Sequence, residues 1–344
     1  MGPDELFATA LILAATTGCS LAEKPAASTP PPPGPPAIDW SAFDSTSERN
    51  PNDGSLRGGV PLPLAAPGLR FNPGRDPNAR YGTLEMVHGL VDAGSRVHRE
   101  LGGLPVTIND LSHAHGGPIP HHRSHQSGRD VDVLFYQIGP DARPIESVGA
   151  FFDPSGAGVD FRDLADPLDD VALQLDVPRT CLFVQTLIED EEAALQHVFL
   201  AEHLRTLLLE YARGHGAPTG TVARFAEMTC QPGYPHDDHL HLRFFCTPDD
   251  IAQGCRDSPP MYPWRRDKLK AAGVRPLPLA PKRKDATAKI VTHQEARERS
   301  SRGGRADGRR GGALARAPRA LARTAAPGSR LLPMTGRSAP DALR

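Results

Sequence analysis

The sequence has little apolar and aromatic material for its length. Of its 344 residues, 39% are hydrophobic and 6% are aromatic, and we find no internal repeat. This content is low for a chain that folds throughout, and the deficit lies at the two ends. We expect residues 1 to about 60 and 281–344 not to fold. The middle, about 220 residues, is ample for one hydrophobic core.

A hydrophobic run long enough to cross a membrane is missing as well. The apolar segment at residues 6–15 is too short for a mature transmembrane helix, and it fits the apolar core of a signal peptide. A Gly-Cys pair that ends at Cys19 follows it and is similar to a bacterial lipobox. Asp4 and Glu5 depart from the usual basic start, and Thr16 stands where an aliphatic residue is usual. We expect export to the periplasm, with Cys19 as a candidate lipid anchor.

Cysteine is scarce, with five in the chain. If Cys19 carries lipid, an even set of four remains, which in an exported chain predicts disulfides with three connectivities open. The pairing that we favour is Cys181–Cys230 with Cys246–Cys255. Four reduced, buried thiols are the alternative, which an oxidising compartment disfavours.

The two ends differ in composition. Residues 28–36 are mostly proline, which forms an extended, semi-rigid spacer or a tail without a spacing role. Residues 281–344 carry 16 Lys or Arg against 5 Asp or Glu, a net charge of +11. Such a tail binds anionic lipid or wall polymers, or is a solvated extension without a partner. Because the protein is exported, we expect no nucleic acid. The oligomeric state stays open.

These features divide the chain into four segments. They are a signal peptide (1–19), a Pro-rich linker (20–60), a folded domain (61–280) and a disordered basic tail (281–344).

Two short motifs inside the folded segment carry metal-binding chemistry. The first, at 122–132 (HRSHQSGRDVD), has a His and an Asp separated by six residues, and the second, at 236–241 (HDDHLH), has two His at i and i+2. A catalytic zinc takes three imidazole or carboxylate ligands and keeps one position for water. The candidate ligands are His125, Asp132 and His241. His239 would then stand beside the water.

The strand period supports this grouping. Residues 131–136 and 239–244 both alternate with a period of two, so Asp132 leaves one face of its strand, and His239 and His241 share a face. If the two strands pair, Asp132 and His241 meet over one sheet surface. Gly128 permits a sharp turn in the loop that brings His125.

The remaining segments predict an α+β fold, a small antiparallel sheet with helices to one side. We expect helices at 83–101 and at 190–213, the second capped by Asp190, and a strand at 104–108. Residues 139–178 are expected to be an irregular loop.

Two readings compete with a catalytic metal site. The His-rich loop is also compatible with a solvated polar segment, and a structural zinc is the other alternative. Structural zinc sites are usually rich in cysteine, and this set has none. We assign His113, His115 and His121 to the surface or to the core.

The motifs 124–132 and 236–241, together with Asp110–Ser112 and Gly116–Gly117, resemble the penicillin-insensitive murein endopeptidases. That family belongs to the superfamily of lysostaphin-type and D-Ala-D-Ala metallopeptidases and hedgehog domains. The resemblance covers residues 82–255. It implies the same architecture, bound Zn²⁺, and cleavage of D-Ala to meso-diaminopimelate cross-links in peptidoglycan. It also implies insensitivity to β-lactams, because the family lacks a serine nucleophile, and it makes His122 a possible fourth ligand.

Within this site we assign chemistry to imidazoles. His239 is placed as a general base or as a donor to the oxyanion, and His236 and His122 are second candidates. Asp130 either orients a ligand imidazole or faces solvent. Arg129 and Arg243 either hold a peptide carboxylate or have surface roles.

Two alternative functions stay open. One is a D,D-carboxypeptidase of the same superfamily, for which Asp237 or Asp238 would supply the base. The other is a non-catalytic, zinc-bearing lipoprotein that binds the wall.

Overall fold

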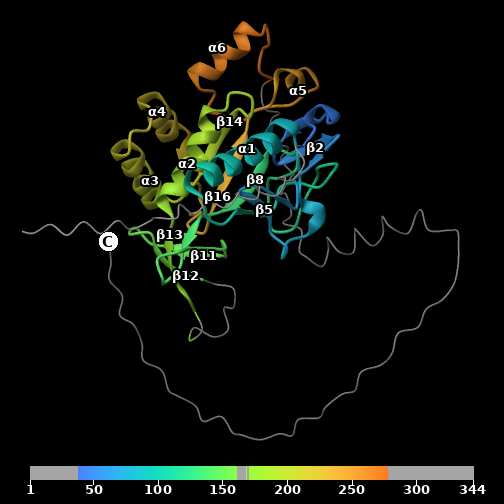
Figure 1. Cartoon of the computed structure of the whole chain (residues 1–344). Helices are drawn as coiled ribbons and strands as arrows, with labels where there is room; N and C mark the ends of the chain where they lie inside the picture. The colour runs from blue at the N-terminus through green and yellow to red at the C-terminus, as the bar shows by residue number, and fades with distance from the viewer. Residues whose placement is uncertain (1–37, 161–167, 169, 278–344) are drawn as a thin grey trace, which may run out of the picture. The chain divides into compact units, whose positions relative to one another are not determined.

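The structure is a computed structural model, and it describes residues 38–160, 168 and 170–277 (Figure 1). The expected signal peptide with Cys19, the proline run and the basic tail lie outside the described residues. All described residues fall in one compact unit. Within them, no helix combines the length and the apolar character that crossing a membrane requires.

The folded region begins earlier than the sequence indicates. The hairpin of β1 (Thr46–Asn50) and β2 (Asp53–Arg57) lies in the segment expected as linker. It is anchored to a segment about 200 residues later, because the Ser47 amide donates to Asp250 at 2.9 Å and the Arg49 amide to the Gly254 carbonyl at 3.3 Å. An expected linker that runs to residue 60 is therefore too long. The hairpin has few apolar residues, so composition alone places it outside the fold.

A seven-stranded mixed sheet forms the centre, in the order β15-β14-β16-β8-β7-β5-β4. Its strands are β4 (Ala65–Ala66), β5 (Leu69–Phe71), β7 (Val106–Ile108), β8 (Asp130–Leu134), β14 (Leu195–Phe199), β15 (Thr229–Cys230) and β16 (His239–Phe244). The α+β class is confirmed, and the expected pairing of β8 with β16 is antiparallel. The sheet is neither small nor wholly antiparallel, because β14 runs parallel to β15 and β5 to β7.

Helices pack on one face of this sheet. They are α1 (Leu84–Leu101), α2 (Val177–Glu189), α3 (Glu202–Gly214) and α4 (Thr219–Met228). Figure 1 shows α1 and α2 in front of β8 and β16. Val131 and Val133 of β8 join Leu240 and Leu242 of β16 in one buried core with residues of these helices. The opposite face of β8 and β16 is left for the polar residues of the two motifs.

The expected helix at 190–213 is wrong in its first half. Residues 195–199 form β14, whose first four side chains are buried, and a helix begins only at Glu202. A strand covered on both faces lacks alternation, so its apolar pattern is easily taken for a helix. The α2 helix was missed, although Asp176 caps its first turn and Pro178 stands inside it, both typical of a helix start.

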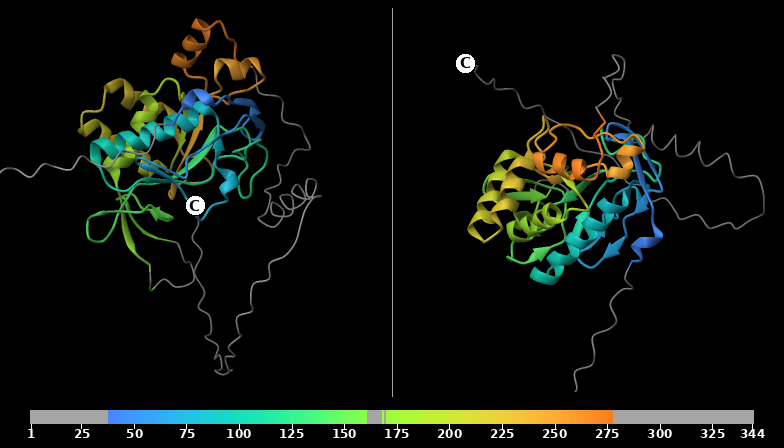
Figure 2. Two further views of the ribbon diagram at one scale, coloured as in Figure 1. Left: turned by 45° about the vertical axis from the view of Figure 1, so that its right-hand side comes forward. Right: turned by 90° about the horizontal axis from the view of Figure 1, so that it is seen from above.

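The stretch 139–178, expected as a loop, contains most of a second sheet. Its strands, in the order β10-β9-β13-β12-β11, are β9 (Gln137–Ile138), β10 (Pro144–Ile145), β11 (Ala150–Phe152), β12 (Ala157–Asp160) and β13 (Ala172–Leu175). Pro140, Asp141, Pro154 and Gly156 lie in turns or bends between these short strands. Figure 1 and the left view of Figure 2 show β11–β13 projecting from the central sheet.

Short elements complete the described chain. They are the pair β3 (Val60–Pro61) and β6 (Tyr81–Gly82), the 3-10 turns Trp40–Ala42 and Pro77–Ala79, and the helices α5 (Pro248–Ala252) and α6 (Pro263–Ala271).

One expected disulfide forms and the other does not. Cys246 and Cys255 are bonded, with Cα atoms 6.0 Å apart. Cys181 is free and buried in α2, where its sulfur contacts the Leu208 carbonyl, and Cys230 is free and exposed in β15. The expected Cys181–Cys230 bond is therefore wrong, since one thiol faces the helical layer and the other faces outward.

Candidate metal centre

The site is built on the polar face of β8 and β16. In their antiparallel register His241 lies directly opposite Asp132, and Arg243 lies opposite Asp130. Opposed residues share a face, with Cβ atoms about 4.5–5.5 Å apart. The pairing therefore places both carboxylates of β8 under the polar side chains of β16, as the alternation predicts.

The Asp132 carboxylate is the hub of the cluster, with four imidazoles facing it. Oδ1 lies 3.2 Å from Nδ1 of His241, 3.5 Å from Nε2 of His125 and 3.5 Å from Nε2 of His239. Oδ2 lies 3.5 Å from Nδ1 of His122. The Asp132 side chain is 6% exposed. Burial would raise the pKa of this carboxyl, but the facing imidazoles hold it well below its usual value.

The loop before β8 is held in an uncommon backbone conformation. His121 and His125 have positive φ angles of 65° and 67°, and Gly128 has 73°. A Cβ at Gly128 would lie 2.8 Å from Leu56, so both the angle and the space require glycine, as expected. Left-handed non-glycine residues are strained and cluster at functional sites.

His125 has one defined tautomer, because its Nδ1 donates to the Leu111 carbonyl at 2.8 Å. The lone pair therefore resides on Nε2, which is fully buried and aimed at Asp132. A backbone carbonyl on the far ring nitrogen is a typical support for a metal-binding histidine.

Asp130 differs from Asp132 in its partner. Arg243 donates two hydrogen bonds to it, at 2.8 and 2.7 Å, and Nε2 of His241 lies 3.3 Å away. Burial would raise the pKa of Asp130, but Arg243 lowers it well below its usual value. Asp130 is fully buried, so the solvent-facing alternative is wrong. Because Arg243 is committed to Asp130, it neither holds a substrate carboxylate nor has only a surface role.

Arg129 is also structural. It is 1% exposed and donates to Asp257 at 3.0 Å and to the Phe244 carbonyl at 2.8 Å. Both roles expected for it, in substrate binding or at the surface, are wrong.

His239 is oriented by its neighbour in the chain. Its Nδ1 lies 2.7 Å from the Asp238 carboxylate, which leaves Nε2 toward Asp132. Burial would lower the pKa of His239, but the two carboxylates raise it to about 10. A proton on the His239 ring is therefore stabilised as long as neither Asp132 nor Asp238 binds a metal ion.

His236 and His122 flank the cluster. The His236 ring lies 5.0 Å from that of His239 and 5.5 Å from that of His241, and its backbone has a φ of 56°. Burial lowers its pKa. Nε2 of His122 lies 3.2 Å from Asp110, which also approaches Arg75 at 3.5 Å. The structure thus brings every expected site residue into one cluster.

The histidines assigned elsewhere stay at its edge or outside it. His113 is half-buried, and His115 and His121 are exposed.

The donor atoms fit a divalent cation. Groups able to hold one are His122–His125–Asp132, His125–Asp130–His241 and His236–His239–His241, each with ligand atoms within 4.8 Å of one another. Nε2 of His125 and Oδ1 of Asp132 are both buried without a hydrogen-bond partner. Two ligands of a tetrahedral zinc with bonds of about 2.0–2.2 Å lie roughly 3.3–3.5 Å apart. The 3.5 Å separation between His125 and Asp132 matches this spacing better than a hydrogen bond, and the 3.2 Å separation between His241 and Asp132 is close to it.

One residue that packs against the site, Phe199, is not indicated by the sequence. The Phe199 ring of β14 packs against His241 at 5.2 Å between centroids, and Arg243 lies over it. Because residues 190–213 were read as a helix, nothing placed Phe199 beside the ligand strand.

A comparison with known families supports the motif reading in part of the chain. No curated protein matches the sequence. The family model of the penicillin-insensitive murein endopeptidase matches residues 50–148. This range contains His122, His125 and Asp132 and ends before the 236–241 motif. The matched range starts and ends earlier than residues 82–255, over which the motifs show the resemblance. Residues 50–148 therefore match the penicillin-insensitive murein endopeptidase family, as the sequence motifs indicate.

Proposed function

We propose that this protein is a zinc-dependent murein endopeptidase that hydrolyses D-alanyl cross-link peptide bonds in peptidoglycan. The observation that carries the proposal is the buried Asp132 carboxylate with four imidazoles 3.2–3.5 Å away. The family match to residues 50–148 supports the reaction class. The D-Ala to meso-diaminopimelate bond and insensitivity to penicillin follow from the family resemblance.

Burial separates the ligands from the groups that handle protons. His125, Asp132 and His241 are the buried members, and we assign them as zinc ligands. Asp130 is the poorer carboxylate ligand because Arg243 already neutralises it. When bound, zinc supplies a Lewis acid that polarises a carbonyl and acidifies water.

The partly exposed imidazoles face the side from which a substrate can enter. We assign His239 as the group that accepts and returns a proton, through Nε2. Its Nδ1 is fixed by Asp238 at 2.7 Å, which is the support that a general base requires. His236 lies next to the rings of His239 and His241 and can donate a hydrogen bond to a developing oxyanion.

His122 has two roles open to it. Its Nδ1 faces the second oxygen of Asp132, as a fourth ligand would. Its Nε2 faces Asp110, which would equally orient a ring that donates to the reacting peptide.

The family also implies the location. A murein endopeptidase acts in the periplasm, and we propose export with Cys19 as the lipid anchor.

A single experiment tests this function against its two alternatives. Zinc content and turnover are measured on purified protein before and after chelation, with cross-linked and uncross-linked muropeptides as separate substrates. His98→Ala, at an exposed histidine of α1, is the matched control for the histidine variants. Zinc-dependent cleavage of the cross-linked substrate supports the endopeptidase. Release of terminal D-Ala from the uncross-linked one makes it a carboxypeptidase. Binding of both by zinc-loaded protein without turnover makes it a wall-binding protein.

A further inference from the structure

An arginine with uncommitted hydrogen-bond donors lies at the edge of the metal cluster. Arg129 and Arg243, which the sequence offers for holding a substrate carboxylate, are each bound to an aspartate of the interior. The Arg75 side chain is instead 44% exposed, and its Nη1 lies 3.5 Å from Oδ2 of Asp110. Within the described residues, the Arg75 guanidinium has this ion pair and no hydrogen bond.

Asp110 connects Arg75 to the imidazoles. Nε2 of His122 lies 3.2 Å from the same Oδ2 atom of Asp110, and Nδ1 of His122 lies 3.5 Å from Oδ2 of Asp132. The Asp110 residue is buried, so these contacts form away from bulk water. The guanidinium of Arg75 is therefore separated from His122 by a single carboxylate.

The turn that carries Arg75 is fixed to the central sheet. The Asn72 amide donates to the Ile108 carbonyl at 2.8 Å, and Nδ2 of Asn72 donates to Oδ1 of Asn109, also at 2.8 Å. Asn72 also closes the turn, because it accepts from the amides of Gly74 at 2.9 Å and of Arg75 at 3.1 Å. A cation on a fixed turn loses little conformational freedom when it binds a ligand.

The contact with Asp110 leaves donors of Arg75 for a second anion. A separation of 3.5 Å marks an ion pair and not a well-formed hydrogen bond, and it involves Nη1 alone. The edge formed by Nε and Nη2 has no partner in the described residues. A guanidinium edge of this kind matches the two oxygens of a carboxylate and binds them through parallel hydrogen bonds.

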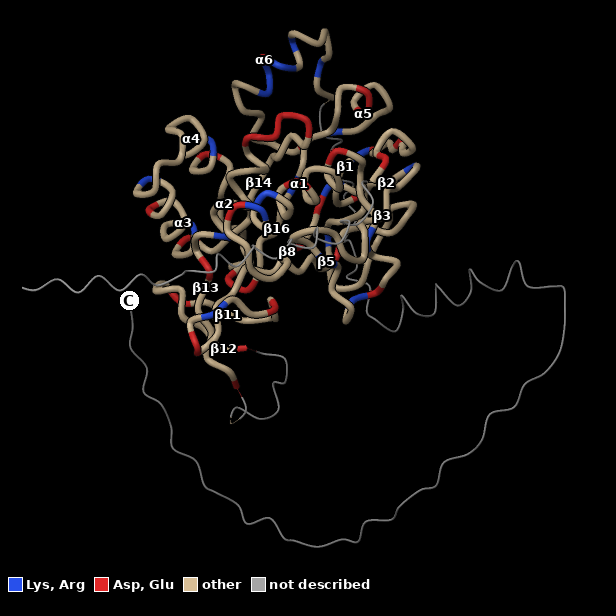
Figure 3. The backbone as a smooth tube through the Cα atoms, viewed as in Figure 1, with Lys and Arg blue, Asp and Glu red and all other residues tan. Residues whose placement is uncertain are grey.

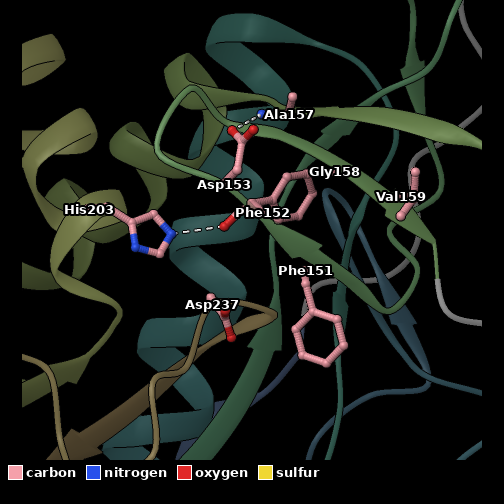
Figure 4. A pocket seen from close by; sticks show the side chains of 8 residues that line it. All are labelled: Phe151, Phe152, Asp153, Ala157, Gly158, Val159, His203 and Asp237. Atoms are coloured by element: carbon pink, nitrogen blue, oxygen red, sulfur yellow. Dashed lines mark hydrogen bonds between the residues drawn. The ribbon is translucent and has the colours of Figure 1, made fainter. Parts of the chain in front are cut away.

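A groove beside the 236–241 motif has the opposite charge. Figure 3 shows acidic residues around β11–β13. The groove, of about 520 Å³, has Asp153, His203 and Asp237 in its lining and no Lys or Arg (Figure 4). Hydrogen bonds from Ser155 lower the pKa of Asp153, so this residue is an anion at neutral pH. A substrate carboxylate is therefore repelled in this groove and attracted to Arg75.

We infer that Arg75 binds a free carboxylate of the substrate peptide close to the scissile bond. In a cross-link between D-Ala and diaminopimelate, the carbon that carries the leaving amine also carries a carboxylate. This carboxylate is the group that we assign to Arg75, while Nη1 stays with Asp110. The inference rests on the proposed function, because it names a residue that recognises the peptide hydrolysed at the cluster. Arg75 then determines specificity and does not touch the reacting atoms.

The experiment compares two synthetic cross-linked muropeptides in which this carboxylate is either free or amidated. Wild-type protein should show a KM about 10-fold lower for the free acid, which corresponds to roughly 1.4 kcal/mol for one charge-assisted contact. Arg75→Gln should raise KM for the free acid about 10-fold and leave kcat within about twofold. It should change KM for the amide by less than about twofold. Arg75→Lys keeps the charge without the fork and should give an intermediate KM.

Matched measurements separate recognition from a structural role. Arg143→Gln is the control, because Arg143 is exposed and its 3.9 Å contact with Asp141 is also an ion pair without a hydrogen bond. This variant should leave KM for both substrates unchanged. Arg75→Gln should keep the zinc content and melting temperature of wild type. An equal rise in KM for both substrates would make Arg75 structural and overturn the inference. A preference for the free acid that persists in Arg75→Gln would assign that preference to zinc and also overturn it.

Failure of the Arg75 assignment and failure of the proposed function give different results. Calorimetric titration of zinc-loaded His239→Ala protein with acetyl-D-Ala-D-Ala and with its terminal amide reports binding without turnover. The dipeptide carries its carboxylate on the carbon next to the amide nitrogen, as the cross-link does. If wild type hydrolyses no muropeptide, but the titration shows a preference for the free acid that an added Arg75→Gln removes, the carboxylate site stands and the reaction is wrong. If turnover is zinc-dependent but neither assay distinguishes the carboxylate, the reaction stands and the role of Arg75 is wrong.

Discussion

His241 lies directly opposite Asp132 in the β8–β16 pair, with its Nδ1 3.2 Å from Oδ1 of the carboxylate. Two residues along the same strands, Arg243 lies opposite Asp130 and binds it through two hydrogen bonds. The two aspartates of one strand face thus have different partners. One is neutralised by a permanent cation, and the other faces imidazoles, which are neutral when they act as ligands.

This difference predicts unequal effects on zinc. Asp132→Asn should reduce bound zinc to under about 0.2 per chain, because it removes the anionic ligand of a three-ligand site. Asp130→Asn should keep zinc but weaken its affinity roughly 10- to 100-fold, as loss of an outer partner of a ligand imidazole does. Elemental analysis and competition with a chelating dye measure both. Equal loss of zinc in the two variants would mean that Asp130 is itself a ligand.

His239 and His241 should differ in the same assay. His239→Ala should keep its zinc and its melting temperature, while turnover of cross-linked muropeptide falls by roughly 10²–10⁴, the usual contribution of a positioned acid or base. His241→Ala should lose zinc together with activity. A metal-free His239→Ala protein would show that the two roles are exchanged. Wild-type turnover in this variant would move the base to His236, His122 or the 237–238 aspartates.

The cysteines should divide into three kinds. Replacing Cys246 and Cys255 with serine should cost about 2–3 kcal/mol of unfolding free energy, the chain-entropy value for a loop closed over 9 residues. Alkylation of the native, unreduced protein should label exposed Cys230 and spare buried Cys181. Mass spectrometry after digestion checks the labelling, and Cys230→Ser is the control for stability. A Cys181–Cys230 linked peptide in the digest would contradict the structure.

Acid should destabilise the fold through His197. Burial, reinforced by the charge of Arg243, lowers the pKa of the His197 imidazole on β14 to about 4, compared with about 6.5 in an unfolded chain. Between these values the unfolded state binds a proton that the folded state does not. Stability from this group is therefore present above about pH 6.5 and is lost as the pH falls toward 4. His197→Gln should show a smaller drop in melting temperature between pH 7 and pH 5 than wild type, with His98→Gln as control. An unchanged drop would assign the acid sensitivity to other groups.

The segment after residue 280 should be dispensable for hydrolysis. Its basic, apolar-poor composition cannot supply a core. A chain that ends at Ala280 should keep kcat and KM on soluble muropeptides within about twofold, since the cluster residues all lie before it. Loss of turnover in a variant that retains its melting temperature would place the tail in the catalytic unit.

The sequence predicts the site better than the fold around it. Alternation around Asp132 and His241 indicates both strands and the face that they share, because a strand with one polar face has a period that can be read directly. The helix at 84–101 is equally clear from its single apolar stripe. Residues 195–199 carry no such signal, since they are buried on both faces and their pattern does not distinguish strand from helix.

Some relationships have no local signal at all. Nothing near Arg129 indicates that it pairs with Asp257, 128 residues later, or that the 46–57 hairpin packs against residues 250–255. Likewise, the second sheet is made of strands of two to four residues, too short to show a period. These features depend on contacts between distant segments, which composition and spacing do not contain.

The buried guanidinium of Arg129 ties the geometry of β8 and β16 to the segment around Asp257. It stands immediately before β8 and donates to the carbonyl of Phe244, the last residue of β16, as well as to Asp257 beyond the disulfide. One side chain thus clamps the same end of both strands that carry Asp132 and His241. A nick or a loosened contact near residue 257 would leave a cation in the interior without its counter-charge and let those strands drift apart. The geometry of the metal cluster therefore depends on the segment around Asp257, although no residue of that segment contributes a donor atom to the cluster.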